Sequence, residues 1–140
     1  MTGKTHITSG IALSLLVCND FISFILVLVG SILPDIDHNH STLGKVIPII
    51  PKMLKHRGIM HSIWIPLILL FINKPLCYGY FLHLAFDLIT KNGIKPLNPL
   101  FGFTIKIPIV KTGGLLEKII YFLLLILIFI LTIRIIFGLF

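Results

Sequence analysis

Charge is scarce in this chain, and acidic residues are the scarcest of all. Only 12% of the 140 residues are charged, five residues are acidic, and 56% are apolar. Soluble domains are typically about 25% charged and about 45–50% apolar. So little polar surface would not cover a water-soluble globule of this size. The composition therefore indicates an integral membrane protein that forms a single domain over residues 1–140.

Cysteine and several familiar motifs are also sparse or absent. The two cysteines, Cys18 and Cys77, form no CxxC pair and have no zinc-finger spacing. There is no GxSxG, P-loop or GxGxxG motif, so nothing indicates a nucleophile elbow, a P-loop NTPase or a dinucleotide fold. The apolar stretch 11–18 resembles a short signal peptide, but no small-x-small cleavage site follows it. We therefore expect this segment to be retained.

Basic residues dominate the charge that is present, with a net charge of +7. They fall mostly between the apolar runs, which is the pattern that the positive-inside rule produces. Nucleic-acid sites instead cluster basic residues and often interleave them with aromatic ones. We therefore expect membrane lipids, and no nucleic acid, as partners.

Five apolar segments are predicted to be helices, because open strands would leave backbone groups unpaired in lipid. They cover about residues 5–18, 21–33, 58–73, 76–90 and 115–139. Only the last comfortably reaches the roughly 20 residues that cross a bilayer. The predicted fold is an all-α membrane bundle of about five helices, four short and one long and C-terminal. Whether the short helices cross fully or enter only part way stays open.

Local signals refine the ends of these helices. Pro34 disfavours a helical conformation at Leu33, so the second helix should stop there. Thr2 or Thr5 is a suitable cap for the first helix. A turn is expected at 73–75, before the fourth helix.

The loops 34–57 and 91–114 carry most of the lysines and arginines, and they should face the cytoplasm. Alternation then places the N-terminus inside and the short turns at 19–20 and 73–75 outside. Cys18 and Cys77 should lie near the outer side, within reach of an impermeant thiol reagent if they are neither buried nor disulfide-linked. The chain is therefore predicted to be a multi-pass protein of a cell membrane.

This topology gathers all six histidines on the cytoplasmic side. With three of the five acidic residues, the gathered set is His6, Asp35, Asp37, His38, His40, His56, His61, His83 and Asp87. The topology rested on lysine and arginine alone, so the convergence is an independent observation.

The pair in HLAFD is the clearest chemical signal. His83 and Asp87 are four residues apart and share one helix face. Ionisable groups at membrane depth are costly and mark functional sites. Imidazole and carboxylate are the usual ligands of zinc and similar ions. A simple His–Asp hydrogen bond between helices is the plainer alternative.

The stretch PDIDH follows the second helix. Carboxylates in a tight turn, here Asp35 and Asp37, can each reach a metal, or one can orient a ligand histidine. An Asx-type turn is the structural alternative. His38 and His40 are either ligands, groups that orient ligands, or ordinary loop residues.

Three further positions carry weaker signals. His56 and His61 in KHRGIMHS do not share a helix face, so we expect His56 in the loop and His61 in the first turn of the third helix. Gly10, one turn after His6, should admit a neighbouring helix. Glu117 begins the last helix, where it complements the helix N-terminus or serves as a ligand or base. An exposed loop and a solvated terminus are the plainer interpretations of His56 and His6.

An anionic substrate suits these surroundings. Lys45 and Arg57 lie in the basic loop after PDIDH, and arginine is adapted to bind phosphate through two hydrogen bonds. We therefore identify these two residues as candidate substrate-binding groups. Attraction of the loop to anionic lipid headgroups explains the same charges in another way.

Four ordered motifs resemble one family. They are THxxxG at 5–10, GSILPDIDHxxS at 30–41, HRGxxHS at 56–62 and HLxxDxxTxxG at 83–93. Together they resemble the YdjM-like family of inner-membrane-associated, metal-dependent hydrolases over nearly the whole chain. This resemblance implies a membrane-embedded protein with hydrolytic activity.

A more distant similarity is to the zinc-dependent phospholipase C and S1/P1 nuclease group, which also uses an HxxxD pair. That similarity implies a ligand set of His6, Asp35, His61, His83 and Asp87. No second His-rich helix follows HxxxD here, so we expect one or two metal ions rather than three.

The resulting hypothesis is a membrane-bound metal-dependent hydrolase with its site at the cytoplasmic face. A divalent ion, best matched by zinc, would polarise the substrate and supply hydroxide. Asp37 or Asp35 would act as general base. The expected substrate is a phosphoester such as a phosphorylated lipid or a small phosphoester. The alternative is a non-enzymatic metal-binding scaffold or a transporter-like protein.

Overall fold

The computed structural model describes residues 1–38, 41 and 58–138, and its regular structure is helical. The helices are α1 (Gly3–Val17), α2 (Phe21–Ile32), α5 (Trp64–Ile72), α6 (Lys74–Leu88) and α7 (Leu115–Ile136). Two short 3₁₀ turns, η1 (Leu33–Asp37) and η2 (Ile59–His61), complete the set. Within these ranges the only β-type pairing is two isolated bridges. The predicted all-α class, with one long apolar helix at its C-terminal end, is confirmed.

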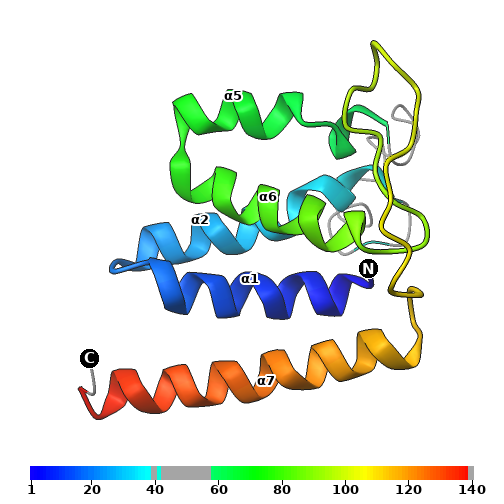
Figure 1. Cartoon of the computed structure of the whole chain (residues 1–140). Coiled ribbons are helices and arrows are strands. Elements are labelled where there is room, and N and C mark those ends of the chain that lie inside the picture. The colour runs from blue at the N-terminus through cyan, green and yellow to red at the C-terminus, as the bar shows by residue number, and fades with distance from the viewer. Residues whose placement is uncertain (39–40, 42–57, 139–140) are drawn as a thin grey trace.

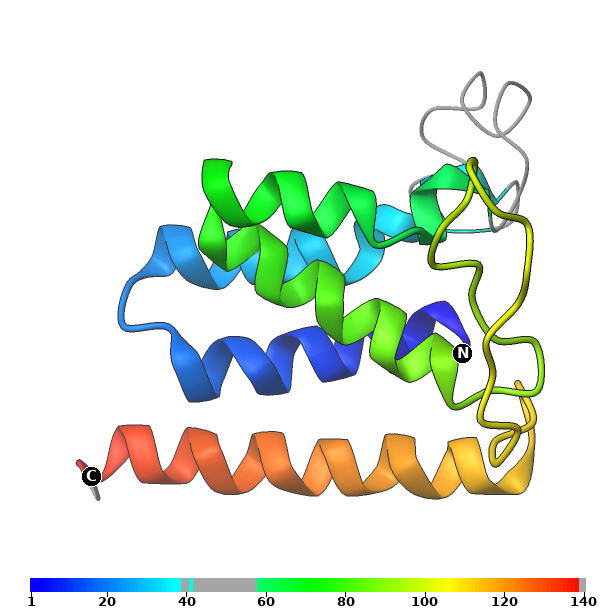
Figure 2. The ribbon, with the colours of Figure 1, turned by 45° about the horizontal axis from the view of Figure 1, so that its top comes forward.

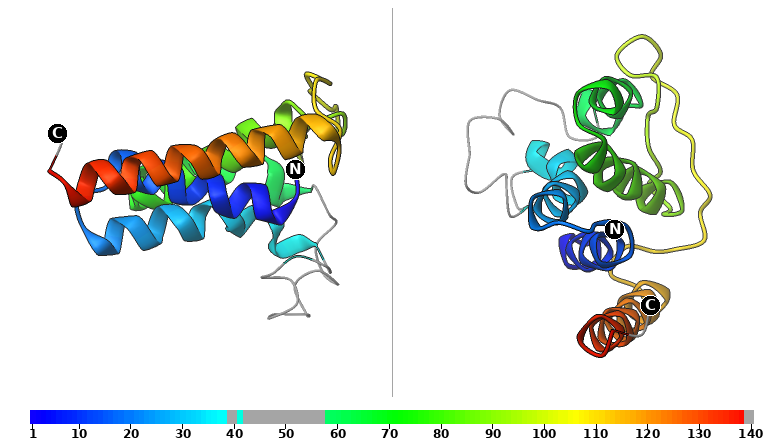
Figure 3. Two further views of the ribbon diagram at one scale, coloured as in Figure 1. Left: turned by 90° about the horizontal axis from the view of Figure 1, so that it is seen from below. Right: turned by 90° about the vertical axis from the view of Figure 1, so that its left-hand side faces the viewer.

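The helices run side by side, and α1 lies between the α2/α6 pair and α7 (Figure 1). The N-terminus, η1, η2 and the segment before α7 all lie at one end, whereas the C-terminus lies at the other (Figure 2). An end-on view shows α7 at the edge of the bundle, against α1 (Figure 3). Within the described residues, the parts of both long connections therefore lie at one end, and the short turns at 19–20 and 73–75 lie at the other, as expected (Figure 2).

The two short turns are built by side-chain caps. Asp20 accepts a hydrogen bond from the Ser23 N–H at 2.8 Å and caps α2. Asn73 accepts one from the Leu76 N–H at 2.9 Å and caps α6. The helix α6 begins at Lys74, earlier than the predicted residue 76. The early start is possible because Pro75 lies in the first turn of α6, where the missing N–H of a proline would have no partner anyway.

The third predicted helix, 58–73, starts later than expected. The turn η2 ends at His61, and α5 begins only at Trp64. Ser62 is extended, with φ −97° and ψ 162°, which interrupts the helix. The Ile63 N–H donates to the Pro96 carbonyl at 2.9 Å, so its hydrogen bond goes to a distant loop. Tertiary pairing thus overrides the continuous apolar pattern.

The end of α2 also differs from the prediction. Leu33 keeps a helical conformation, with φ −60° and ψ −39°, although Pro34 follows it. Since proline has no N–H to donate, the α-helix ends at Ile32, but the chain continues in the tighter 3₁₀ form to Asp37. The restriction that proline places on the preceding residue is a bias, and here packing overcomes it.

Glycines let the backbones of α2 and α6 touch. A Cβ added at Gly79 would collide with the Val27 carbonyl, and one at Gly30 with the Leu76 carbonyl. Close approach of this kind is typical of helix pairs with small interface residues. A Cβ at Gly10 would likewise collide with the Ser31 side chain, which confirms that Gly10 admits a neighbouring helix.

The helix α7 differs from the others in length and surroundings. Among the described residues it is the one helix long and apolar enough to cross a membrane, with 22 residues. Its neighbour is α1, and most of its large apolar side chains are exposed. This agrees with the prediction that only the last apolar segment has the length of a full span.

Candidate metal centre

Four elements deliver polar side chains to one buried point at the loop end of the bundle. They are His6 from α1, Asp35 and Asp37 from η1, His61 from η2, and His83 and Asp87 from α6. The three imidazoles are fully buried, and the carboxylates of Asp37 and Asp87 are at most 2% exposed. Asp35 is the exception, with a side chain that is 19% exposed.

Asp87 lies at the middle of this cluster. Its Oδ1 is 3.4 Å from His6 Nε2. Its Oδ2 is 3.5 Å from His61 Nε2 and 3.9 Å from His83 Nε2. The N-terminal amine of Met1 also contacts Oδ1. One carboxylate therefore faces three imidazoles from three different elements.

Asp35 approaches the same imidazoles from η1. Its Oδ1 is 3.7 Å from His83 Nε2 and 3.9 Å from His61 Nε2. Two overlapping groups of potential ligands result, and each has its ligand atoms within 4.8 Å of one another. They are His6, His83 and Asp87, and Asp35, His61 and His83. His83 belongs to both groups and connects them.

Neighbouring acceptors orient two of the imidazoles. His83 Nδ1 lies 2.8 Å from the Ser31 carbonyl oxygen. A carbonyl can only accept, so Nδ1 carries the proton and the lone pair of Nε2 points to the cluster. His61 Nδ1 lies 3.5 Å from Asp37 Oδ2, while its Nε2 faces Asp35 and Asp87. Acceptors placed behind an imidazole in this way are typical of metal-binding histidines.

The unpaired nitrogens test whether the residues present fit a metal ion. Within the described residues, His83 Nε2 and both ring nitrogens of His6 are buried and form no hydrogen bond. The two rings stack with their centroids 3.6 Å apart. Leaving a buried polar group unpaired costs about 1–3 kcal/mol. A divalent ion that prefers nitrogen and oxygen ligands would use these lone pairs, so the residues fit such an ion.

The electrostatics of the cluster also favour a cation. Burial opposes the charged form of His61, but the nearby carboxylates of Asp37 and Asp87 outweigh it and raise the pKa of this imidazole to about 9. Without a metal ion, the His61 imidazole therefore keeps its proton, and its positive charge offsets the carboxylates around it.

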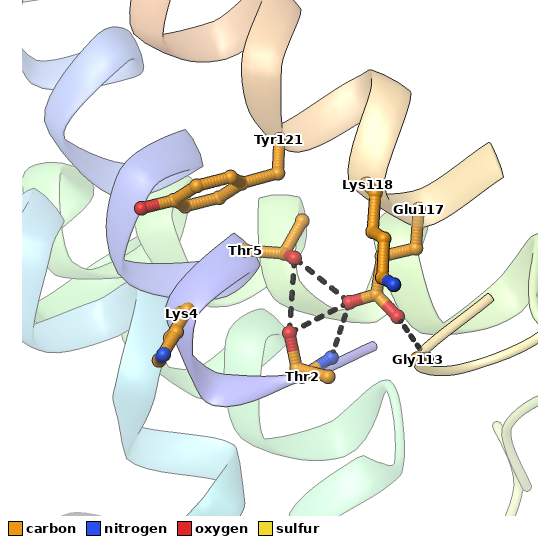
Figure 4. A pocket seen from close by; sticks show the side chains of 7 residues that line it. All are labelled: Thr2, Lys4, Thr5, Gly113, Glu117, Lys118 and Tyr121. Carbon is orange, nitrogen blue, oxygen red and sulfur yellow. Dashed lines mark hydrogen bonds between the residues drawn. The ribbon is translucent and has the colours of Figure 1, made fainter. Parts of the chain in front are cut away.

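The remaining sequence candidates lie elsewhere. His38 follows η1, and it is in neither ligand group. Glu117 is in the first turn of α7, where it accepts hydrogen bonds from Thr2, Thr5 and Gly113 (Figure 4). It too is in neither group. Candidates outside the described residues are His40, His56, Lys45 and Arg57.

Sequence reasoning did not identify Ser31 as part of the centre. Its contribution is a backbone carbonyl, which no side-chain pattern reveals. The available signal was the run of small residues at 30–31, because close helix packing brings the backbone of α2 next to α6.

Two comparisons with known proteins give matches over most of the chain. The chain is similar to "Uncharacterized protein YvsG" of Bacillus subtilis (strain 168), with 36% identity over 141 residues, covering 86% of this chain and 87% of that protein. No solved structure gives a significant match. The model of the YdjM inner membrane protein family matches residues 1–139, and this chain therefore belongs to that family.

Proposed function

We propose that this protein is a membrane-bound, metal-dependent hydrolase that acts on a phosphoester such as a phosphorylated lipid. One observation supports this most strongly. Imidazole nitrogens and carboxylates from four elements face one buried point, and several of those nitrogens lack a hydrogen bond. Such an arrangement is costly unless another atom completes it.

We place the whole bundle in the membrane, with the metal centre at the cytoplasmic face. The short helices run alongside α7 (Figure 1), and large apolar side chains are exposed on them as well, including Phe21 at 77% and Phe71 at 89%. Lipid is the medium in which such surfaces are stable. The lysines near the loop end orient that end inward.

Thiol labelling tests this orientation. Cys18 lies at the far end of α1 and is partly exposed, so an impermeant reagent should modify it from outside. Cys77 is fully buried, and its Sγ lies 3.1 Å from the Pro66 carbonyl oxygen. It should resist the reagent from either side and serves as the internal control. Labelling of Cys18 only from the cytoplasmic side would reverse the proposed topology.

The position of each residue in the cluster indicates its proposed role, either metal binding or proton transfer. When bound, a divalent ion such as zinc would polarise a phosphoryl oxygen and supply a hydroxide nucleophile at neutral pH. His6, His61, His83 and Asp87 would hold the ion. Asp35 is the most exposed carboxylate of the cluster, so substrate approaches from its side, and it is well placed to accept a proton.

Asp37 has a different position from Asp35. It is buried behind His61, on the side away from the other carboxylates. We therefore assign it the role of positioning the imidazole rather than that of general base. Substrate binding by Lys45 and Arg57 remains part of the proposal, because these residues follow PDIDH in the sequence and suit a phosphoester.

The experiment combines metal analysis with turnover of the purified protein in mild detergent. Substrates are a chromogenic phosphodiester and phosphatidic acid. The variants are His83→Ala and Asp35→Asn. The matched control is Asp20→Asn, since this carboxylate lies at the far end and asparagine caps a helix equally well.

Wild type should retain a divalent metal and hydrolyse at least one substrate. His83→Ala should lose both metal and turnover, and Asp35→Asn should lose turnover while retaining most of the metal. Asp20→Asn should keep both. A wild-type protein free of metal, or full turnover by His83→Ala, would overturn the proposal.

A metal-stabilised scaffold is the second candidate, and the deep burial of most of the cluster favours it. Buried structural sites contribute directly to folding. Chelation separates the two functions. A large fall in the unfolding temperature, with no turnover by the metal-loaded protein, would favour the scaffold. A transporter would need ionisable groups through to the other end, where the described residues offer mainly Asp20, Lys74 and Arg134.

A further inference from the structure

A second hollow lies between α1 and α7, separate from the metal centre. Its volume is about 250 Å³. The first turn of α1 and the first two turns of α7 form its walls, as Figure 4 shows. The lining residues are Thr2, Lys4, Thr5, Gly113, Glu117, Lys118 and Tyr121. Six of these seven carry a polar group on the side chain, yet most of the surface that lines the hollow is apolar, so it suits a ligand with both a charged and an apolar part.

Glu117 forms the fixed floor of this hollow. Its Oε1 accepts hydrogen bonds from the Thr2 N–H at 2.6 Å, the Thr2 hydroxyl at 2.8 Å and the Thr5 hydroxyl at 2.7 Å. Its Oε2 accepts one from the Gly113 N–H at 2.6 Å. The negative charge of Glu117 is therefore stabilised by donors of the protein. Lys4 and Lys118 remain available to a ligand.

Lys4 and Lys118 bring positive charge to the same hollow from different helices. Neither forms an ion pair with any residue that the structure describes. Tyr121 adds a ring and a hydroxyl to the wall (Figure 4). Two cations and a hydroxyl donor at one opening match a phosphate group.

The position of the hollow at the start of α7 favours a lipid headgroup as the source of that phosphate. Leu115, Leu116 and Phe122, which flank the hollow, are each at least 50% exposed. Lysine and tyrosine at the start of an apolar span are typical of the headgroup level of a membrane. A ligand with a phosphate and apolar chains fits both surfaces, whereas a free phosphate fits only the first.

We propose that this hollow binds the phosphate of an anionic phospholipid, with Lys4 and Lys118 as the two charged contacts. The lipid chains lie along the exposed side of α7. The site is distinct from the metal centre, because α1 lies between them (Figure 1): His6 stacks on His83 of α6, whereas Thr5 bonds Glu117 of α7. The proposal does not depend on hydrolytic activity.

Native mass spectrometry of the delipidated full chain tests the site. Phosphatidylglycerol and phosphatidylcholine with identical chains are added in parallel to wild type and to the double variant Lys4→Gln/Lys118→Gln. Lys106→Gln is the matched control, since Lys106 is exposed in the segment before α7 and does not line the hollow. Neither substituted lysine bonds to Glu117, and circular dichroism checks that the helices persist.

Wild type should bind one phosphatidylglycerol several times more tightly than phosphatidylcholine. The affinity of the double variant for phosphatidylglycerol should be about tenfold lower, since each lysine near a membrane surface adds to the attraction for an anionic headgroup. Tyr121→Phe should lose about twofold, and Lys106→Gln should match wild type.

Unchanged phosphatidylglycerol binding in the double variant would overturn the site. Equal binding of the two lipids would overturn the preference for an anionic headgroup. A further arm adds millimolar inorganic phosphate alone. Tight binding of inorganic phosphate without selective lipid binding would show a soluble phosphate site and overturn the lipid assignment. Metal content should be the same in all variants, so failure here leaves the hydrolase proposal untouched.

Discussion

Two buried carboxylates, Asp87 and Glu117, are both contacted by the first two residues of the chain. They are 1% and 2% exposed. The Met1 amine contacts Asp87, and the next backbone N–H, from Thr2, donates to Glu117. The two residues before α1 therefore join two acidic sites whose other contacts differ sharply.

Glu117 is bound by short hydrogen bonds from four donors, whereas Asp87 has the contact with the Met1 amine and otherwise faces imidazole nitrogens at longer distances. The donors to Glu117 lie at 2.6–2.8 Å, the range of strong hydrogen bonds. The imidazole nitrogens around Asp87 lie at 3.4–3.9 Å, too far for good hydrogen bonds. Ligand atoms around a small tetrahedral ion at zinc distances lie about 3.3 Å apart. The wider spacing at Asp87 therefore suits a shared cation, and the tighter one at Glu117 suits a structural link.

Asp87→Asn should break this contrast most strongly. Asparagine keeps the shape but removes the charge that faces three imidazoles, so metal affinity should fall more than about 100-fold, beyond the loss typical of an outer contact. The measurement is metal content and competition with a chelator of known affinity. Glu117→Gln, the same change in the other carboxylate, should keep the wild-type metal content. Equal metal loss in both variants would remove the distinction between the two sites.

The pH dependence of metal binding should sharpen the comparison. The pKa of His61 in the metal-free protein is raised to about 9, so at pH 7 this imidazole is protonated and the ion must displace the proton. As the pH is raised toward that value, the contribution of His61 to metal affinity should increase about tenfold for each pH unit. Above that value it should level off.

Calorimetry in buffers of different ionisation enthalpy counts the released protons. Release of about one proton from this imidazole at pH 7 is expected. An affinity that is flat between pH 6 and 8 would contradict protonation of His61. Glu117→Gln should leave the pH profile unchanged, because this carboxylate lies in the other acidic site.

Helical spacing made the α6 part of the centre predictable. His83 and Asp87 are four residues apart, which places them on one face in any helix, and the structure keeps that relation. His6 and His61 were predicted with less support, because each lies alone in the sequence and meets the others only through helix packing. The loop-end topology, inferred from lysine and arginine, supplied that missing information.

Long-range partners explain what the sequence did not predict. Thr2 occupies the N-cap position of α1, as a threonine should, but its hydroxyl donates to Glu117 instead of capping the helix. Glu117 was predicted to complement its own helix or to act as a ligand or base. Its partners Thr2 and Thr5 are more than a hundred residues away in the sequence, and only the packing of α7 on α1 brings them together.

Glu117→Ala should break the other half of the comparison. Four donors lose their acceptor, and because some of them can reach water, we expect a loss of about 2 kcal/mol in the free energy of unfolding. Denaturation in mild detergent measures this loss. Glu117→Gln should lose less, since the amide still offers one acceptor. Metal loss at unchanged stability would instead make Glu117 a ligand.

Asp37→Asn should have the smallest effect and tests how the metal centre is oriented. The amide oxygen can still accept from His61 Nδ1, so metal affinity should fall only about tenfold. The pH profile is the more specific measurement. Removing this charge lowers the pKa of His61 toward its ordinary value, so the proton competes less and metal affinity should depend less steeply on pH. A residue that merely supports the fold would lower stability and leave that slope unchanged, which would refute the positioning role of Asp37.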